Sequence, residues 1–258
     1  MIPVGILTYR RPHFFRQTLE SFIRLNYACL DRFTLLLLVQ DVDDETEKVI
    51  ETFKEYLHEV FYQENKGCAA GYSEIMQICL SYNTPLVMHL QDDWLSTEPL
   101  THYLGLIETM FEIKRGIGYI RLRSIKEHVS KQNRLSKELI GCPHCPGGSR
   151  PRSPVFGDDE VNLKRMGKFT PYDEPYSMCR ADIRGTVHQA RLHWTFNPTI
   201  IRSDVLTPLL PFTKELDAMR KFHETGLNGA QLNANCFRHI GLKRAMTVNE
   251  KGQEVWVN

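Results

Sequence analysis

The stretch Phe33–Val39 restricts the fold of this chain more than any other, because it is apolar at every position except Thr34. A strand with one face in water alternates apolar and polar residues, whereas a strand covered on both faces is apolar throughout. The run therefore predicts a central strand in a sheet that carries helices on both sides, an arrangement typical of α/β proteins.

Strands and helices are expected to alternate through the first hundred residues. The helices are expected to begin near Pro12, near Asp43 or Asp44, and after Gly67, each with apolar residues at helical spacing. The strands are expected at 4–7, 33–39, 60–62 and 85–90. Four strand–helix units with short links predict a mostly parallel, doubly wound, Rossmann-like sheet with helices on both faces.

The second half of the chain is less regular. A helix is expected over 104–113, a strand over 117–122, an acidic helix over 214–225 and a strand-like piece over 236–241. Between them, residues 121–168 carry eleven Lys and Arg against five Asp and Glu. This basic, Gly- and Pro-containing stretch predicts a long, partly mobile excursion at about 122–190.

Composition indicates a globular protein of ordinary kind, with 42% hydrophobic residues and a net charge of +1. No apolar run approaches the length of a membrane span, and the N-terminus does not resemble a signal peptide. Seven irregularly spaced cysteines fit a reducing compartment, so we expect the cytoplasm. Cys142, His144 and Cys145 suggest zinc, but four ligands are normal and no second pair is suitably spaced, which favours a loop with incidental thiols.

Two carboxylates follow the apolar run that starts at Pro85. The run ends on Gln91, Asp92 and Asp93, where a parallel strand would deliver its last side chains to the ligand-binding edge of the sheet. Neighbouring carboxylates repel each other unless a cation or polar ligand lies between them, and oxygen ligands suit Mg²⁺ or Mn²⁺. The pattern predicts a metal-assisted reaction on a phosphate-bearing substrate; the alternative is that both acids cap the next helix.

The sequence after the first strand, Thr8-Tyr9-Arg10-Arg11-Pro12, resembles the opening of inverting, family 2-like glycosyltransferases with the GT-A fold, in which Thr-Tyr-Asn-Arg-Pro joins a strand to a helix. Further motifs follow in the order that this family shows. They are Asp41 after the second strand, Asn65-Lys66-Gly67 with Gly71, Gln91-Asp92-Asp93 at the DxD position, and Glu215-Leu216-Asp217 ahead of Gly226.

The resemblance implies a nucleotide-sugar donor, with UDP favoured, and Mn²⁺ or Mg²⁺ as the cofactor. It implies that Asp93 binds the metal and that Asp92 faces the ribose or the surroundings of the metal. Thr8, Tyr9 and Arg10 would line the nucleotide pocket together with Gln91, Asp41 and Gly67.

Several of these assignments have alternatives. Arg10 stands where the family has Asn, and both Arg10 and Arg11 could be solvated residues near a helix start. Asp41 competes with the nearby Asp43 and Asp44. Lys66 could meet a phosphate as a point charge or could be an exposed turn residue.

An inverting transferase needs a general base, and the resemblance assigns this role to Glu215, with Asp217 as runner-up. Their spacing on a helix points them about 200° apart, and the alternative is that both are first-turn acids favoured by the helix dipole. His239 resembles a late histidine that binds the metal, although a core histidine is the alternative. Trp194 and Asn197 lie where acceptor contacts are common in the family, and core packing is the alternative.

We expect one domain over 1–258, with a nucleotide-binding half at 1–95 and an acceptor-binding half at 96–258. The acceptor would be a glycan or another hydroxyl-bearing molecule; no nucleic acid partner is expected, and the basic stretch leaves room for peripheral membrane contact. A sugar nucleotidyltransferase is a rival, but its glycine-rich, basic phosphate loop is missing near the N-terminus. A non-catalytic module that binds nucleotides or polyanions is the other rival, although 121–168 lacks regular aromatic interleaving.

Overall fold

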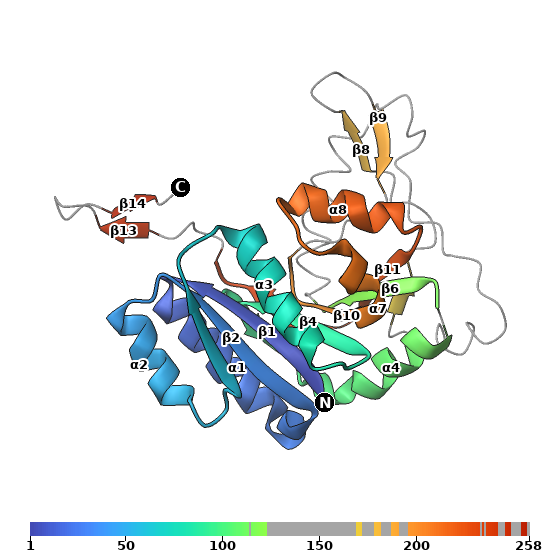
Figure 1. The fold of residues 1–258 in the computed structure, drawn as a ribbon. Coiled ribbons are helices and arrows are strands. Elements are labelled where there is room, and N and C mark those ends of the chain that lie inside the picture. The colour runs from blue at the N-terminus through green and yellow to red at the C-terminus, as the bar shows by residue number, and fades with distance from the viewer. Residues whose placement is uncertain are drawn as a thin grey trace.

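The computed structural model describes residues 1–113, 115–122, 169–171, 178–181, 187–190, 196–232, 234, 236–241, 246–248 and 254–256. An eight-stranded sheet forms its centre (Figure 1). In spatial order its strands are β3 (Glu59–Gln63), β2 (Phe33–Gln40), β1 (Ile2–Tyr9), β4 (Leu86–Gln91), β10 (Thr199–Arg202), β6 (Ile117–Arg121), β11 (Asn228–Leu232) and β7 (Phe169–Pro171).

The α-helices of the described part are α1 (Pro12–Asn26), α2 (Asp44–Phe53), α3 (Cys68–Ser81), α4 (Leu104–Ile113), α7 (Ser203–Leu206) and α8 (Glu215–Glu224). Short 3-10 helices are η1 (Tyr27–Arg32), η2 (Leu100–His102) and η3 (Thr207–Leu209). Three further strand pairs are β5 (Trp94–Ser96) with β12 (Phe237–His239), β8 (Met178–Ala181) with β9 (Val187–Ala190), and β13 (Met246–Val248) with β14 (Glu254–Trp256). Within the described ranges, no helix is both long and apolar enough to cross a membrane.

Strands β3, β2, β1 and β4 run parallel to one another, so their carboxyl ends meet at one edge of the sheet. β10 runs antiparallel to β4 and to β6, β11 returns parallel to β6, and β7 closes the sheet antiparallel to β11. The predicted α/β fold with a mostly parallel sheet is confirmed, and in this sheet only β10 and β7 run against the other described strands.

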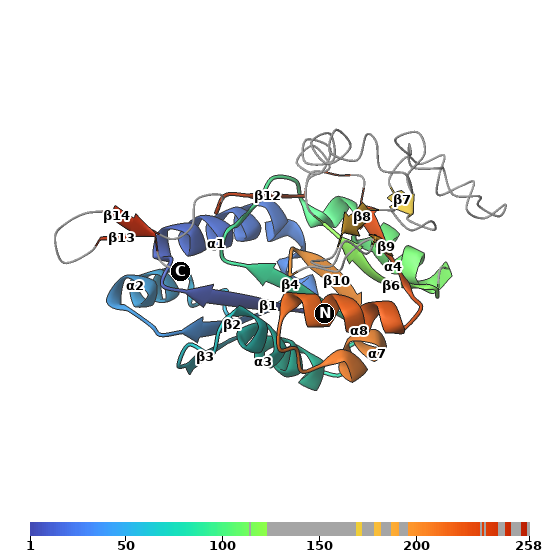
Figure 2. The ribbon, with the colours of Figure 1, turned by 90° about the horizontal axis from the view of Figure 1, so that it is seen from above.

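Helices cover both faces of the sheet, with α1 on one side and α3 on the other (Figure 2). In β2, Leu35 and Leu37 belong to the core that includes α1 and α2, whereas Leu36 and Leu38 pack in the core built on α3. Successive side chains of a strand point to opposite faces, so both faces of this apolar run are buried, as the sequence predicts.

Helix α1 begins at Pro12, whose fixed backbone angle suits the first helical position and whose missing N–H is not needed there. Phe15, Leu19 and Phe22 recur at helical spacing and are fully buried against the sheet. This packing places the start of α1 directly after the carboxyl end of β1, at the edge where the four parallel strands end.

The stretch expected to be irregular contains described strands, namely β7, β8 and β9. Each has only three or four residues, which is too short for a strand pattern to stand out in the sequence. Cys142, His144, Cys145 and Trp194 lie outside the described residues, as does 123–168.

Candidate functional site

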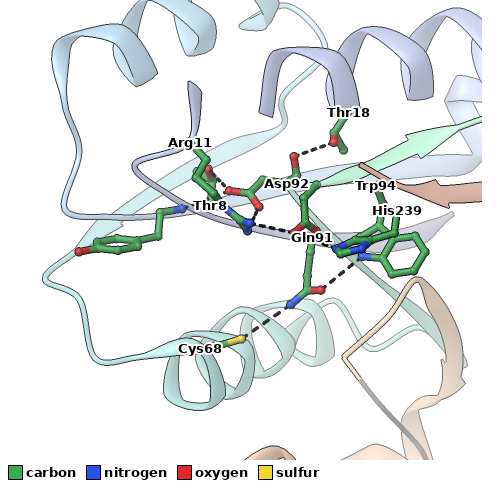
Figure 3. A network of polar contacts seen from close by, with 10 residues as sticks. Thr8, Arg11, Thr18, Cys68, Gln91, Asp92, Trp94 and His239 are labelled. Carbon is green, nitrogen blue, oxygen red and sulfur yellow. Dashed lines mark hydrogen bonds and ion pairs between the residues drawn. The ribbon is translucent and has the colours of Figure 1, made fainter. Parts of the chain in front are cut away.

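Two buried carboxylates stand at the carboxyl end of β4. Asp92 and Asp93 follow Gln91, the last residue of the strand, and are 0% and 6% exposed. A buried charge is costly unless it is paired and hydrogen-bonded. The surroundings of these two side chains therefore define the site, and Figure 3 shows the contacts between them and their neighbours.

Asp92 is held from several sides. One carboxylate oxygen, Oδ2, accepts hydrogen bonds from Thr8 Oγ1 at 2.8 Å and from the Tyr9 N–H at 3.4 Å, and the other oxygen pairs with Arg11 (Figure 3). The backbone carbonyl of Asp92 accepts a bond from Thr18 Oγ1 at 2.8 Å. Burial raises the pKa of Asp92 to about 6, and the Arg11 charge acts in the opposite direction. These contacts fix Asp92 in place.

One carboxylate oxygen of Asp93 has two partners, and the other oxygen has no partner among the described residues. Its Oδ2 accepts from Arg11 Nη1 at 2.8 Å and lies 3.2 Å from His239 Nε2, while its buried Oδ1 has no partner among the described residues. Burial alone would raise the pKa of Asp93, but the hydrogen bond with His239 and the charge of Arg11 lower it. Asp93 is therefore ionised at neutral pH.

Strand pairing brings His239 to the acid pair from a distant part of the chain. β12 pairs with β5 in the register that sets His239 opposite Trp94, and the two rings lie 4.8 Å apart. The Ile240 N–H donates to the Asp93 carbonyl at 2.9 Å. At Gly241 a Cβ atom would overlap the Asp93 carboxylate, so the backbone can pass there only without a side chain.

Asp93 and His239 fit two positions of a divalent cation site. Mg²⁺ and Mn²⁺ bind through a small number of protein ligands when substrate phosphates and water complete the shell. The orphaned Oδ1 of Asp93 is an available oxygen ligand. The described residues contain no group of three or more His, Cys, Asp and Glu side chains that could hold a metal ion.

Sequence reasoning missed the role of Arg11, which forms ion pairs with both Asp92 and Asp93. A signal was present in the sequence, because a basic residue just after one strand can neutralise acids just after the adjacent parallel strand. β1 pairs directly with β4, with Leu7 opposite Gln91.

A second cluster lies where β1 and β2 end. Arg10 and Asp41 both have left-handed backbones, with φ of 47° and 46°, a conformation that is uncommon outside glycine and often marks functional sites. Arg10 Nε donates to the Asp41 carbonyl at 3.4 Å, and the two side chains lie 3.7 Å apart. Asp41 Oδ1 accepts from the Asn65 N–H at 2.9 Å. The structure thus brings the predicted Arg10 and Asp41 together.

The rival acid at the end of β2 has a structural role. Asp43 caps α2, its Oδ1 accepting from the Thr46 N–H at 2.7 Å, and Asp44 is the first residue of that helix, so both have places in α2 that Asp41 does not share.

The turn before α3 is shaped by Gly67. Its φ of 84° lies in the region that favours glycine, and its N–H donates to Asn65 Oδ1 at 2.8 Å. Lys66 is exposed and its Nζ lies 3.3 Å from a carboxylate oxygen of Glu74. In this structure Lys66 therefore forms a surface ion pair.

Gln91 links the acid pair to the start of α3. Its Nε2 lies 3.7 Å from the Cys68 thiol, and its Oε1 accepts from Trp94 Nε1 at 3.4 Å (Figure 3). Loss of hydration raises the pKa of Cys68 to about 11, and the carboxylates of Glu215 and Asp92 add to this effect. The Cys68 thiol therefore lies within electrostatic reach of both Glu215 and the acid pair, and the sequence did not single it out.

The two candidate bases differ in their surroundings. Glu215 is exposed at the first position of α8, and its Oε1 accepts from the Phe196 N–H at 3.2 Å. Asp217 is held by residues in and just before its own helix: its Oδ2 accepts from the Thr213 N–H at 3.3 Å and its Oδ1 from Arg220 at 2.9 Å. The Thr213 hydrogen bond lowers the pKa of Asp217. Both acids lie in the first turn of α8, as the helix-start alternative has it, but only the Glu215 charge also raises the pKa of Cys68.

Two further residues near the site are His89 and Asn197. His89 lies inside β4, fully buried against Tyr72 with 4.2 Å between the ring centroids, and burial lowers its pKa to about 3. His89 therefore stays neutral inside the core. The backbone carbonyl of Asn197 accepts from Thr199 Oγ1 at 2.8 Å.

Solved structures of glycosyltransferases resemble this chain in fold. The mannosyltransferase PcManGT of Pyrobaculum calidifontis, in complex with GDP-Man and Mn²⁺, matches 94% of this chain at a TM-score of 0.54 and 14% identity. S. aureus TarS 1-349 in complex with UDP-GlcNAc matches 95% at 0.53 and 12%. Glucosyl-3-phosphoglycerate synthase of Mycobacterium tuberculosis, in complex with Mn²⁺, UDP and phosphoglyceric acid, matches 98% at 0.52 and 15%.

Because the sequences share so few residues, these similarities concern the fold alone. The GT-A fold predicted from the sequence is confirmed by them. This chain spans 57%, 62% and 73% of the three chains, respectively. No model of a known protein family matches the sequence, and no curated protein matches it.

Proposed function

We propose that this chain is a metal-dependent glycosyltransferase that moves a sugar from a nucleoside diphosphate to an acceptor hydroxyl, with inversion at the anomeric carbon. The observation that carries the proposal is Asp93, which stands at the carboxyl edge of a GT-A sheet with one buried oxygen unpartnered in the described structure and His239 beside the other. A nucleotide-sugar donor and a divalent metal match the ligands of the similar structures.

Asp93 and His239 would hold Mn²⁺ or Mg²⁺. When bound there, the metal supplies positive charge that neutralises the diphosphate as the glycosidic bond breaks. Asp92, fixed by Thr8 and Arg11, would present its carboxylate toward the ribose and the surroundings of the metal.

The nucleotide would lie across the ends of β1 and β2. Tyr9 is the last residue of β1 and Arg10 follows it; Asp41 follows β2, and its N–H donates to the Gln63 carbonyl at 3.0 Å. Gly67, Lys66 and Gln91 are proposed to line the side toward α3. UDP is favoured over GDP on the strength of the sequence resemblance, and two of the three similar structures hold UDP or a UDP-sugar.

Glu215 is proposed to remove the proton from the acceptor hydroxyl. A general base must reach the attacking oxygen with its carboxylate available. The Glu215 side chain is exposed. Its charge raises the pKa of the Cys68 thiol, as the charge of Asp92 also does. Asp217 is occupied by contacts with Thr213 and Arg220, which makes it the weaker candidate.

The chain is further proposed to be a single domain over 1–258, with its acceptor side formed by 96–258. We propose a cytoplasmic location from the cysteine pattern. Any peripheral contact with a membrane is proposed to involve the basic stretch 121–168. The acceptor is proposed only as a hydroxyl-bearing molecule.

Calorimetric titration of UDP and GDP, with and without Mn²⁺, tests the donor site directly. Wild type should bind one of the two nucleotides in a metal-dependent manner, and Asp93→Asn should lose that dependence. Asp31→Asn is the matched control, because it removes an exposed carboxylate in η1, before the amino end of β2 and so at the opposite edge of the sheet.

Folded wild-type protein that binds neither nucleotide under any condition would contradict the proposal and favour a polyanion-binding module. Once the nucleotide is known, its sugars can be screened by product formation. The anomeric configuration of the product, read by NMR, then decides between inversion and retention. Glu215→Gln should abolish turnover while nucleotide binding persists.

A further inference from the structure

Arg11 binds both members of the acid pair at once. One nitrogen of its guanidinium pairs with Asp92 Oδ1, and the other lies 2.8 Å from Asp93 Oδ2. The Arg11 side chain is only 23% exposed. Paired contacts between a guanidinium and carboxylates are among the strongest hydrogen bonds in proteins, because both partners are charged and the geometry is fixed.

Arg11 occupies one of the two Asp93 oxygens that a divalent cation could use, namely Oδ2. His239 Nε2 lies 3.2 Å from the same Asp93 oxygen that Arg11 contacts, a separation that suits two neighbouring ligands of one cation, so a cation held there would share that oxygen with Arg11. Arg11 also places a positive charge next to the cation's carboxylate ligand. Two positive charges at a few ångströms repel strongly where water is largely excluded.

We infer that Arg11 competes with the divalent cation for Asp93, so that the metal binds tightly only together with the diphosphate of the donor. This inference rests on the proposed function and describes how that site is loaded. A diphosphate offers the guanidinium another anionic partner, which frees Asp93 for the metal. Because coupling between two ligands is reciprocal, the metal and the nucleotide must then raise each other's affinity.

The test is Mn²⁺ binding to the full chain, followed by the electron paramagnetic resonance signal of free Mn²⁺ and without any nucleotide. Wild type should bind Mn²⁺ weakly, and Arg11→Gln should bind it about tenfold more tightly because the competing charge is gone. In wild type, saturating UDP or GDP should strengthen Mn²⁺ binding; in Arg11→Gln this gain should be smaller.

Two more variants keep the result interpretable. Arg11→Lys retains a positive charge but cannot hold both carboxylates together, so it should remain folded and bind Mn²⁺ about threefold more tightly than wild type. Arg16→Gln removes one charge from an exposed position of the same helix and should leave Mn²⁺ binding unchanged. Thermal unfolding confirms that each variant is folded before its binding is compared.

If folded Arg11→Gln and Arg11→Lys bind Mn²⁺ no more tightly than wild type, the competition does not exist. If Arg11→Gln does not fold, Arg11→Lys alone decides. The metal-only comparison does not involve a nucleotide, so its failure is distinct from failure of the proposed function, which would show as no nucleotide binding at saturating Mn²⁺.

Discussion

The Cys68 thiol can report whether Glu215 faces the donor site. The pKa of this thiol is raised from 9.0 to about 11, first by loss of hydration and then by the Glu215 and Asp92 carboxylates. A folded-state pKa above the ordinary value means that the reactive thiolate stays scarce until the pH approaches 11. The rate of alkylation should therefore keep rising through pH 10, where an ordinary thiol would already level off.

The size of the effect follows from two opposing terms. At pH 8 a pKa shift of this size leaves roughly a hundredfold less thiolate than an ordinary cysteine has. The thiolate that does form is roughly tenfold more nucleophilic, because its sulfur is more basic. Alkylation should therefore be about tenfold slower than for an unperturbed thiol. Glu215→Gln removes one of the charges that raise the pKa and should speed alkylation about two- to threefold. Asp217→Asn should leave the rate unchanged, because the contacts of Asp217 are with Thr213 and Arg220 and not with Cys68.

Iodoacetamide labelling followed by peptide mass spectrometry measures the rate at Cys68 separately from the other cysteines. Equal rates at pH 8 for wild type, Glu215→Gln and Asp217→Asn would refute the placement of Glu215 beside the site. A rate that levels off near pH 9 would refute the raised pKa.

Three other substitutions have defined outcomes. Thr8→Val removes the hydroxyl that donates to buried Asp92 and should lower the free energy of unfolding by about 1–3 kcal/mol, measured by urea denaturation. Asp43→Ala removes the cap of α2 and should cost about 1 kcal/mol in the same assay while nucleotide titrations stay as in wild type; weakened binding would assign the nucleotide contact to the wrong acid. Gly241→Ala places a methyl group against Asp93 and should abolish metal-dependent nucleotide binding, and unchanged calorimetry would mean that this backbone does not border the site.

Much of the fold could be predicted from the sequence because the signals are local. A strand buried on both faces, such as Phe33–Val39, is apolar at nearly every position. The residues that are buried are the same residues that show the apolar pattern in the sequence. The same holds for the helix that starts at Pro12 and for the acids directly after β4. Short strands such as β8 gave no such signal, because four residues are too few to show a period.

The contacts of the candidate site were decided by tertiary structure. His239 reaches Asp93 only because β12 pairs with β5, and the register of that pairing joins residues far apart in the chain. The ion pairs of Arg11 with the two acids depend in the same way on how α1 packs at the end of the sheet. The contact between Cys68 and Gln91 depends on how α3 packs there.

The sequence by itself determined the α/β alternation, the burial of the central strands and the presence of acids at the end of β4. These depend on the periodicity and chemistry of neighbouring residues. The tertiary structure decided which oxygen of Asp93 is left unpartnered within the described residues, which of Glu215 and Asp217 is held by residues in and just before its own helix, and that Arg11 bridges the acid pair. Those outcomes depend on packing and register between segments far apart in the chain, which the order of residues within any one segment does not encode.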